Sequence, residues 1–190
     1  EYCIREDLKL KRPRMMAVLD PIKLVIDNYP EGQVEYLEAP NNMENEELGT
    51  RKIPFSGELY IERDDFMAEP PKKYKRLYPG NEVRLMNAYF VTCTGYEADD
   101  DGTIRVVHCT YDPETKGGNA PDGRKVKGTI HWVEASNAGK VEVRLYENIV
   151  DEEKGVYNKE DGSLNVNPNS LTVTSAYVEP ELLKAKGYDS

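Results

Sequence analysis

The stretch EVRLMNAYFVTCTGYEADDDGTIRVVHCTYD, Glu82 to Asp112, predicts a β-hairpin. Apolar and polar residues alternate through its first half, and a period of two is typical of a strand with one buried face. The run DDDG at 99–102 ends in Asp-Gly, which favours a tight reversal between antiparallel strands. Cys93 and Cys109 then face each other across the hairpin. A disulfide between them is the less favoured alternative, and we expect reduced thiols.

Shorter runs of the same kind lie on both sides of this hairpin. Each is rich in Val, Ile, Leu or Tyr and is bounded by Pro, Gly, Asn or Asp, as strands are. Helical periodicity is confined to 1–12, which Pro13 ends, and to 181–186. The pattern therefore predicts an all-β barrel or sandwich in two units, divided near 136–139. The expected strands are 15–20, 23–29, 33–39, 53–66 (running into a turn or short helix), 127–135, 140–150 and 170–180.

Bulk properties limit the class of protein only loosely. The chain has 190 residues and a formal net charge of -10, which argues against nonspecific coating of nucleic acid but allows a local basic patch. No apolar run is long enough to span a membrane, so we expect no membrane association. The three cysteines lack zinc-ligand spacing. Because the chain opens at Glu1 inside a charged helical pattern, we expect a piece of a larger protein.

Motifs of common enzymes are absent from the sequence. There is no phosphate-binding loop, no dinucleotide fingerprint and no Gly-x-Ser-x-Gly nucleophile turn. The two histidines, His108 and His131, both fall in expected strands, where a structural role is the more common one. We therefore expect no catalytic residue, no metal and no cofactor in this chain.

Basic side chains form four groups against the acidic background, each near tyrosine, tryptophan or proline. Splayed RNA bases stack on aromatic rings while guanidinium groups form forked hydrogen bonds with base edges, so the combination suits single-stranded RNA. One group alone is better explained as protection of a strand end, whereas four together favour RNA binding. The groups are Lys9, Lys11, Arg12 and Arg14; Lys72, Lys73, Lys75 and Arg76; Arg84; and Arg124, Lys125 and Lys127.

The last group belongs to DGRKVKGTIHWVEA, Asp122 to Ala135, which also contains His131 and Trp132, the only tryptophan. Two interpretations fit this run. Its cations form either a phosphate-binding face or a solvated strand edge that lysines protect from pairing. The residues alone leave both open.

Six segments, in order, closely resemble the C-terminal anticodon-binding region of the bacterial glutaminyl-tRNA synthetase family. This class I family carries its ATP- and magnesium-dependent catalytic domain before two β-barrels that grip the anticodon loop. The resemblance implies an RNA-binding module without an active site, with tRNA(Gln) as partner and no DNA, acting as a monomer in the cytoplasm. The segments are CIREDL (3–8), AVLDPIKLVIDNY (17–29), PFSGELYIERDDF (54–66), YKRLYPGNEVRLMNAYFV (74–91), CTYDPET (109–115) and DGRKVKGTIHWV (122–133).

The resemblance also implies three divisions. Residues 1–13 would end the helical region that contacts the tRNA stem, residues 14–136 would form the first barrel, and residues 137–190 would form part of a second barrel whose end is missing. The stability of such a piece and the orientation of its barrels stay open.

Four site residues follow from the resemblance, position by position. Arg14 matches an arginine that contacts the middle anticodon base, a uridine. Lys75 and Arg76 match the pair at the third base, a guanosine, and Arg84 matches an arginine at the first base. Arginine and lysine suit the acceptor edge of guanine, and arginine also binds phosphates.

Two departures weaken parts of this assignment. Met86 stands where related sequences carry arginine, and the loop 41–47 is more acidic than expected. Three alternatives remain. An archaeal or eukaryotic type glutamyl-tRNA synthetase shares the barrels, but RLMNAYFV favours the glutaminyl branch. A free ribosomal RNA-binding β-barrel protein does not explain the upstream helix, and a carbohydrate-binding module does not explain the ordered basic groups.

Overall fold

The computed structural model describes residues 2–151 and 153–185. Glu1 and Lys186, at the outer ends of the two expected helical segments, lie outside the described residues. The elements are α1 (Tyr2–Lys9), β1 (Ala17–Val18), β2 (Pro21–Ile26), β3 (Glu35–Pro40), β4 (Thr50–Phe55), β5 (Glu58–Glu62), β6 (Glu82–Leu85), β7 (Phe90–Ala98), β8 (Ile104–Asp112), β9 (Thr129–Ile130), β10 (Val133–Glu134), β11 (Gly139–Tyr146), β12 (Leu171–Val178), and short 3₁₀ turns at Glu46–Leu48, Arg63–Asp65, Pro113–Thr115 and Pro180–Lys184.

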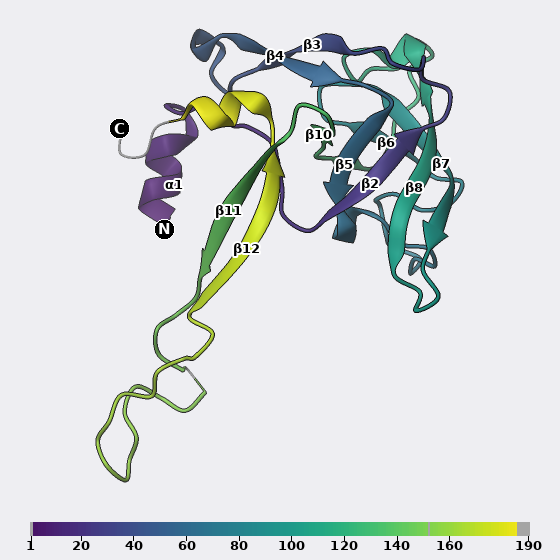
Figure 1. The fold of residues 1–190 in the computed structure, drawn as a ribbon. Helices are drawn as coiled ribbons and strands as arrows, with labels where there is room; N and C mark the ends of the chain where they lie inside the picture. The colour runs from purple at the N-terminus through teal and green to yellow at the C-terminus, as the bar shows by residue number, and fades with distance from the viewer. Residues whose placement is uncertain (1, 152, 186–190) are drawn as a thin grey trace.

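A seven-stranded sheet forms the main body, in the order β10-β5-β2-β8-β7-β6-β9 (Figure 1). Its two edge strands, β9 and β10, are separated in sequence by only His131 and Trp132. The segment 128–134, here called the closing segment, therefore pairs with β6 at one edge and β5 at the other. Joining the two edges curls the sheet into a barrel and leaves no free edge strand there.

The predicted hairpin is confirmed as β7 and β8, but its first strand starts at Phe90 instead of Glu82. The run 82–85 forms β6, which reverses at 86–89 and pairs with β7. Asp99 accepts a hydrogen bond from the backbone of Gly102, whose φ of +83° suits glycine at the reversal. Cys93 pairs directly with Cys109 in the strand register. Both cysteines are buried free thiols. The all-β prediction is likewise confirmed.

The barrel core is one continuous cluster, in which alternate strand residues are joined by buried residues of the connections such as Trp132. Trp132 lies at its centre, 1% exposed, with its ring edge-on to Phe55 at a centroid distance of 5.1 Å. The indole nitrogen donates to the carbonyl oxygen of Met86 at 2.9 Å, which satisfies its only polar group. Leu24, Leu59 and Leu85 are also fully buried. Burying a leucine side chain contributes about 1.5–3 kcal/mol of transfer free energy.

The hairpin β3–β4 covers one end of the barrel, and α1 is attached beside it by the loop 41–45. Leu37 and Ile53 of this hairpin are buried. Asn42, itself 1% exposed, donates to the carbonyl oxygens of Lys9 and Arg12 at 2.8 and 2.9 Å. These bonds satisfy carbonyls at and beyond the end of the helix, which otherwise lack partners.

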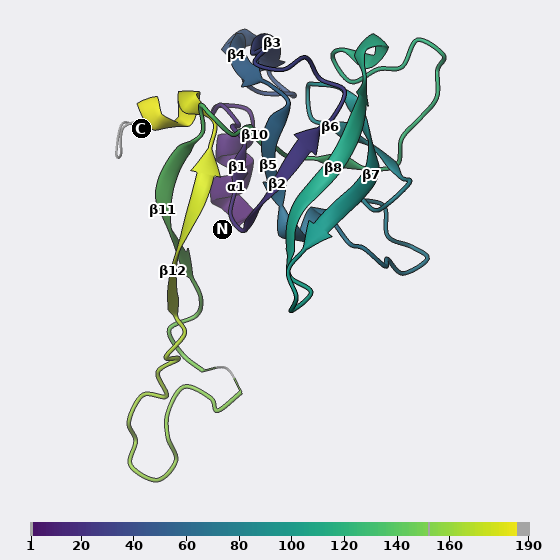
Figure 2. The same ribbon diagram turned by 45° about the vertical axis from the view of Figure 1, so that its right-hand side comes forward.

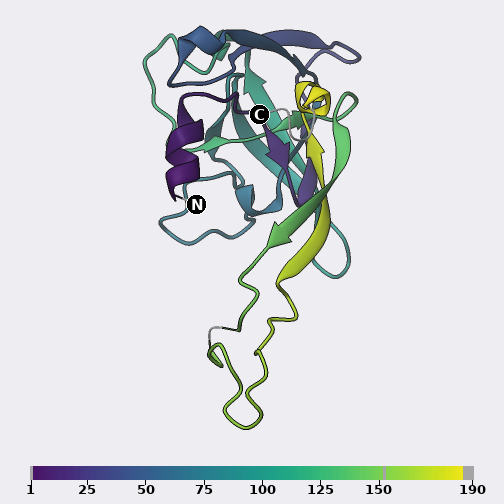
Figure 3. The ribbon, with the colours of Figure 1, turned by 90° about the vertical axis from the view of Figure 1, so that its left-hand side faces the viewer.

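A second sheet, β1-β12-β11, extends away from the barrel as a long twisted ribbon (Figures 1 and 2). The view in Figure 3 shows the loop residues 147–151 and 153–170 at its far end, well beyond the barrel. Val141 and Val143 alternate with charged residues, as predicted, yet neither is buried. A two-stranded ribbon has no covering layer of its own, so its apolar side stays accessible.

Several predicted strands have different bounds in the structure. The run 15–20 contributes only Ala17–Val18, because β1 pairs with the end of β12 alone. The run 53–66 is divided between β4 and β5 by a reversal at Ser56 and Gly57. His131 lies outside any strand, between β9 and β10. Among the described residues no helix has the length and apolarity needed to cross a membrane.

Candidate nucleic-acid interface

The side chains of the closing segment and of the four residues before it point alternately toward the protein and toward solvent. Arg124, Val126, Gly128, Ile130 and Trp132 are buried or half-buried, whereas the side chains between them are exposed. An extended backbone sends successive side chains to opposite sides, so one outer stripe results. This outer stripe consists of Lys125, Lys127, Thr129 and His131.

Lys75 and Arg84 both contact the closing segment through Gly128. The backbone N–H of Arg84 donates to the carbonyl oxygen of Gly128 at 2.9 Å. A Cβ on residue 128 would lie 2.1 Å from the carbonyl oxygen of Lys75, so only glycine fits there. The side chain of Lys75 is exposed. This close approach places the loop 71–76 against the end of the outer stripe.

Arg76 is held by a buried carboxylate. Its guanidinium forms an ion pair with Asp65, whose side chain is 6% exposed, while Arg76 itself remains 53% exposed. Burial raises the pKa of Asp65, although Arg76 and His131 both oppose that shift. The pairing of Phe66 with Leu77 closes the loop between them. The ion pair with Asp65 therefore holds the guanidinium of Arg76 in place while leaving it accessible. The charge of Asp65 also interacts with His131.

Arg14 lines a cavity of about 190 Å³ together with Met86 and His131. Its guanidinium also lies 3.3 Å from Oε1 of Glu44, in the acidic loop that departs from related sequences. The apolar side chain of Met86 forms one wall where a cation was expected from the resemblance. A flat base fits between such polar and apolar walls better than a phosphate does.

Arg84 lies on the other side of β6 from the core. Its guanidinium carbon is 5.4 Å from the centroid of the Phe90 ring, and its Cδ packs where a Cβ on Gly118 would be 3.1 Å away. The Nε atom of Arg84 is buried without a hydrogen-bond partner. The structure does not place Arg84 in the cavity with Arg14.

Arg124 is tied to the protein. It donates to Glu82 at 3.0 and 3.1 Å and to Asp122 at 2.8 Å, and it also contacts Asp112. These carboxylates raise its pKa well above the ordinary value, with Glu82 contributing most. Arg124 is therefore an anchor for the loop 119–127, and its side chain belongs to neither a solvated strand edge nor a free phosphate-binding face.

His131 is the residue whose position sequence reasoning missed. Assigning it to a strand suggested a structural side chain, but it is exposed and lines the cavity with Arg14. Its neighbour Trp132 is the core residue of the pair. The alternation from Lys125 onward carried this signal, because it places residues 125, 127, 129 and 131 on one side.

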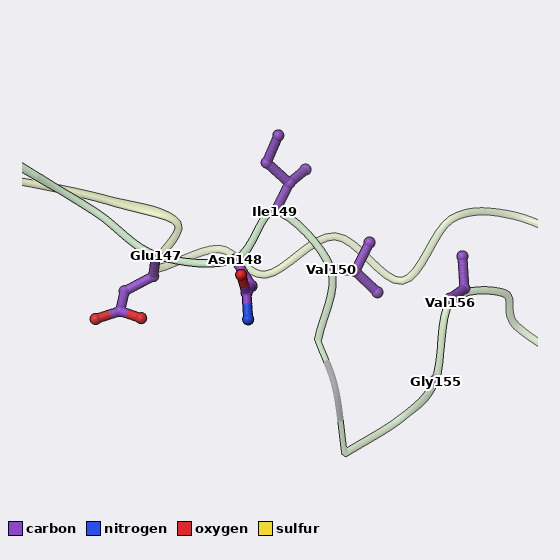
Figure 4. Close-up of a pocket in the computed structure, with 6 residues that line it drawn as sticks. All are labelled: Glu147, Asn148, Ile149, Val150, Gly155 and Val156. Atoms are coloured by element: carbon purple, nitrogen blue, oxygen red, sulfur yellow. The ribbon is translucent and has the colours of Figure 1, made fainter. Parts of the chain in front are cut away.

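A wider hollow of about 620 Å³ lies in the loop of the ribbon (Figure 4). Glu147 and Asn148 point to one side of the loop there, and Ile149 points to the other. Among the described residues of this loop none that lines the hollow is a cation, so they offer no charged group for phosphate. Within residues 2–151 and 153–185, no cluster of His, Cys, Asp and Glu is arranged to hold a metal ion.

Comparison with known proteins identifies the family. A family model described as the anti-codon binding domain of class I tRNA synthetases (E and Q) matches residues 12–112, and a second model with that description matches residues 129–190.

Curated relatives agree along the whole chain. The glutamine–tRNA ligases of Clostridium perfringens and Clostridium kluyveri are 53% and 51% identical over 100% and 98% of this chain. That of Vibrio vulnificus is 49% identical over 99%. The chain spans 34% of the length of each of these relatives. The chain belongs to the anticodon-binding domain family of the class I glutamyl- and glutaminyl-tRNA synthetases.

Proposed function

We propose that this chain reads the anticodon loop of tRNA(Gln) for a glutamine–tRNA ligase. One observation carries the proposal most directly. The closing segment lines a cavity with Arg14 and lies against the backbone of Lys75 and Arg84, which come from segments far apart in sequence, and Arg76 directly follows Lys75. Glutamine is preferred to glutamate because the glutamine–tRNA ligases cited above match the chain throughout.

The proposed roles follow the chemistry of each position. Arg14, in the cavity with Met86 and His131, contacts the middle base. Lys75 and Arg76 read the third base. Asp65 holds the guanidinium of Arg76 in place and leaves it exposed for this contact. Arg84 contributes at the first base from its place on Phe90, and Met86 supplies an apolar contact instead of a second cation. Guanidinium and ammonium groups match the acceptor edge of guanine.

The parent protein, in this proposal, attaches glutamine to its tRNA with ATP and magnesium bound in a separate catalytic domain. The parent acts as a cytoplasmic monomer, binds no DNA and no membrane, and this chain holds no cofactor. We further propose that residues 14–136 form the first barrel and residues 137–190 part of a second, with residues 1–13 ending the stem-contacting region. The closing segment ends at Glu134 and β11 begins at Gly139, which supports a division between them.

The test compares Arg76→Ala and Arg84→Ala in the full-length protein. Each variant should lower kcat/KM for tRNA(Gln) and lose roughly 5- to 150-fold of the discrimination against altered anticodons. Glutamine-dependent ATP–pyrophosphate exchange should remain unchanged. Arg105→Ala is the matched control, because Arg105 is also exposed and paired with an aspartate, Asp99, but lies at the far hairpin turn. Unchanged anticodon discrimination in both variants would refute the assignment.

A further inference from the structure

Two lysines lie at the start of the outer stripe, on surface that the proposed base-reading residues do not use. They are Lys125 and Lys127, and both side chains are exposed. Within the described part of the chain neither of them forms an ion pair. We call these two residues the lysine face.

The neighbouring carboxylates do not neutralise this face. Glu82, Asp112 and Asp122 all bind Arg124, the inward-facing member of the same run. Because Arg124 occupies these three carboxylates, none of them forms an ion pair with Lys125 or Lys127. In a protein of net charge -10, unpaired cations on one face mark a local site for anions.

The outer stripe continues from the lysines to His131 and the Arg14 cavity. From residue 125 to residue 131 an extended chain covers about 20 Å, several nucleotides of a single strand. Lysine is a point charge that suits phosphate and carries no base information by itself, whereas arginine forks read base edges. The lysines at one end of the outer stripe therefore suit phosphate binding, and the arginine cavity at the other end suits recognition of a base.

We propose that the lysine face binds the ribose-phosphate backbone of the RNA strand whose bases reach the Arg14 cavity. This inference rests on the proposed function, because the RNA is the anticodon arm of tRNA. Arg124 is the positioning residue, since its carboxylate contacts hold the loop. The lysine face supplies affinity for any RNA sequence, and the arginines supply the choice among sequences.

The experiment titrates tRNA(Gln), and the same tRNA with a changed anticodon, against the full-length protein between 50 and 200 mM KCl. The double variant Lys125→Ala/Lys127→Ala removes two cations without removing any ion pair or hydrogen bond among the described residues. Lys140→Ala/Lys159→Ala is the matched control, because both residues are exposed, lie on the ribbon and change the net charge equally. Circular dichroism and Trp132 fluorescence verify that the variants remain folded.

Because the double variant loses two phosphate contacts, the slope of log K against log salt concentration should become shallower by about 1.4. Over a fourfold change in salt this alters the ratio of wild-type to variant affinity by about sevenfold. Both tRNAs should lose affinity by the same factor, and the control should keep the wild-type slope. A slope equal to that of the control overturns the proposal, and so does a loss confined to the cognate anticodon, which would make the lysines base readers.

Failure of the proposed function has a different signature. In that case the wild-type protein shows no preference between the two tRNAs, or Arg76→Ala leaves the preference intact, whatever the lysine variant does. A wild-type preference combined with an unchanged slope in the lysine variant rejects only the phosphate-binding role. Each proposal can therefore fail while the other is still tested.

Discussion

Arg51 and Glu179 form a buried ion pair that joins the barrel to the base of the ribbon. Nη2 of Arg51 lies 2.9 Å from Oε1 of Glu179 and donates a hydrogen bond to Oε2 at 3.2 Å. Oε1 has no partner of good hydrogen-bond geometry, and Nε of Arg51 has none either. Burial raises the pKa of Glu179 even though Arg51 opposes that shift. Because two atoms of this buried pair lack hydrogen-bond partners, the pair contributes more to the orientation of the ribbon on the barrel than to the free energy of unfolding.

Arg51→Met should destabilise the protein by about 3–5 kcal/mol, because it leaves the carboxylate of Glu179 buried without a countercharge. The double variant Arg51→Met/Glu179→Leu should recover most of that loss, since both charges are then absent. Urea unfolding followed by the fluorescence of the single tryptophan, Trp132, measures both. Equal losses in the single and double variants would contradict this account.

Gly128→Ala should destabilise the barrel by about 1–3 kcal/mol or more, as overpacking does. The new Cβ would stand 2.1 Å from a backbone carbonyl, which cannot rotate away as a side chain would. Gly95→Ala in β7 is the control, because nothing lies within 4 Å of its Cβ position. Thermal unfolding of the two variants gives the comparison, and similar melting temperatures would show that the loop 71–76 yields freely.

His108 should titrate above the ordinary histidine pKa. Its Nδ1 lies 2.9 Å from Asp27 and its Nε2 lies 3.1 Å from Glu97, and the bond to Asp27 contributes most to the raised pKa. Because the folded-state pKa is raised, this stabilisation is complete below about pH 6.5, the unfolded value, and disappears as pH rises through the folded pKa.

Nuclear magnetic resonance of the two histidine rings measures this shift directly, with His108→Gln identifying the resonance. In the same variant the free energy of unfolding should lose its dependence on pH in that window. The other charged or titratable groups that bear on this site are Cys109, which the charge of Asp27 influences, and its strand partner Cys93. The pKa of Cys109 is raised, whereas the hydrogen bond with Cys109 lowers the pKa of Cys93, so the His108→Gln variant is needed to separate the histidine from the thiol. A ring pKa at or below 6.5 would contradict the prediction.

Glu44→Gln should strengthen RNA binding. The carboxylate of Glu44 lies 3.2 Å from Lys9 and 3.3 Å from Arg14, so it partly neutralises the proposed reader of the middle base. Removing its charge should raise the affinity and make the salt dependence steeper. Glu47→Gln, in the same loop and without an ion pair among the described residues, removes an equal charge and should have a smaller effect. Equal gains in both variants would indicate a general effect of net charge.

The sequence alone predicted the β7–β8 hairpin with Cys93 opposite Cys109, because alternation and an Asp-Gly reversal are local features that carry their own register. It also predicted the all-β class and, through six separated segments, the family. The four proposed readers were named at the same stage. Their roles in RNA recognition are still predictions.

Only the tertiary structure decided how the distant segments meet. The pairing of β6 with β9 and of β5 with β10 depends on closing a sheet across many residues, and no local pattern encodes which edges join. For that reason the same run of cations proved to contain an anchored Arg124 and an unpaired lysine pair. The sequence alone contains the alternating pattern of residues 124–132. The barrel that packs behind this segment determines which of its two sides faces solvent.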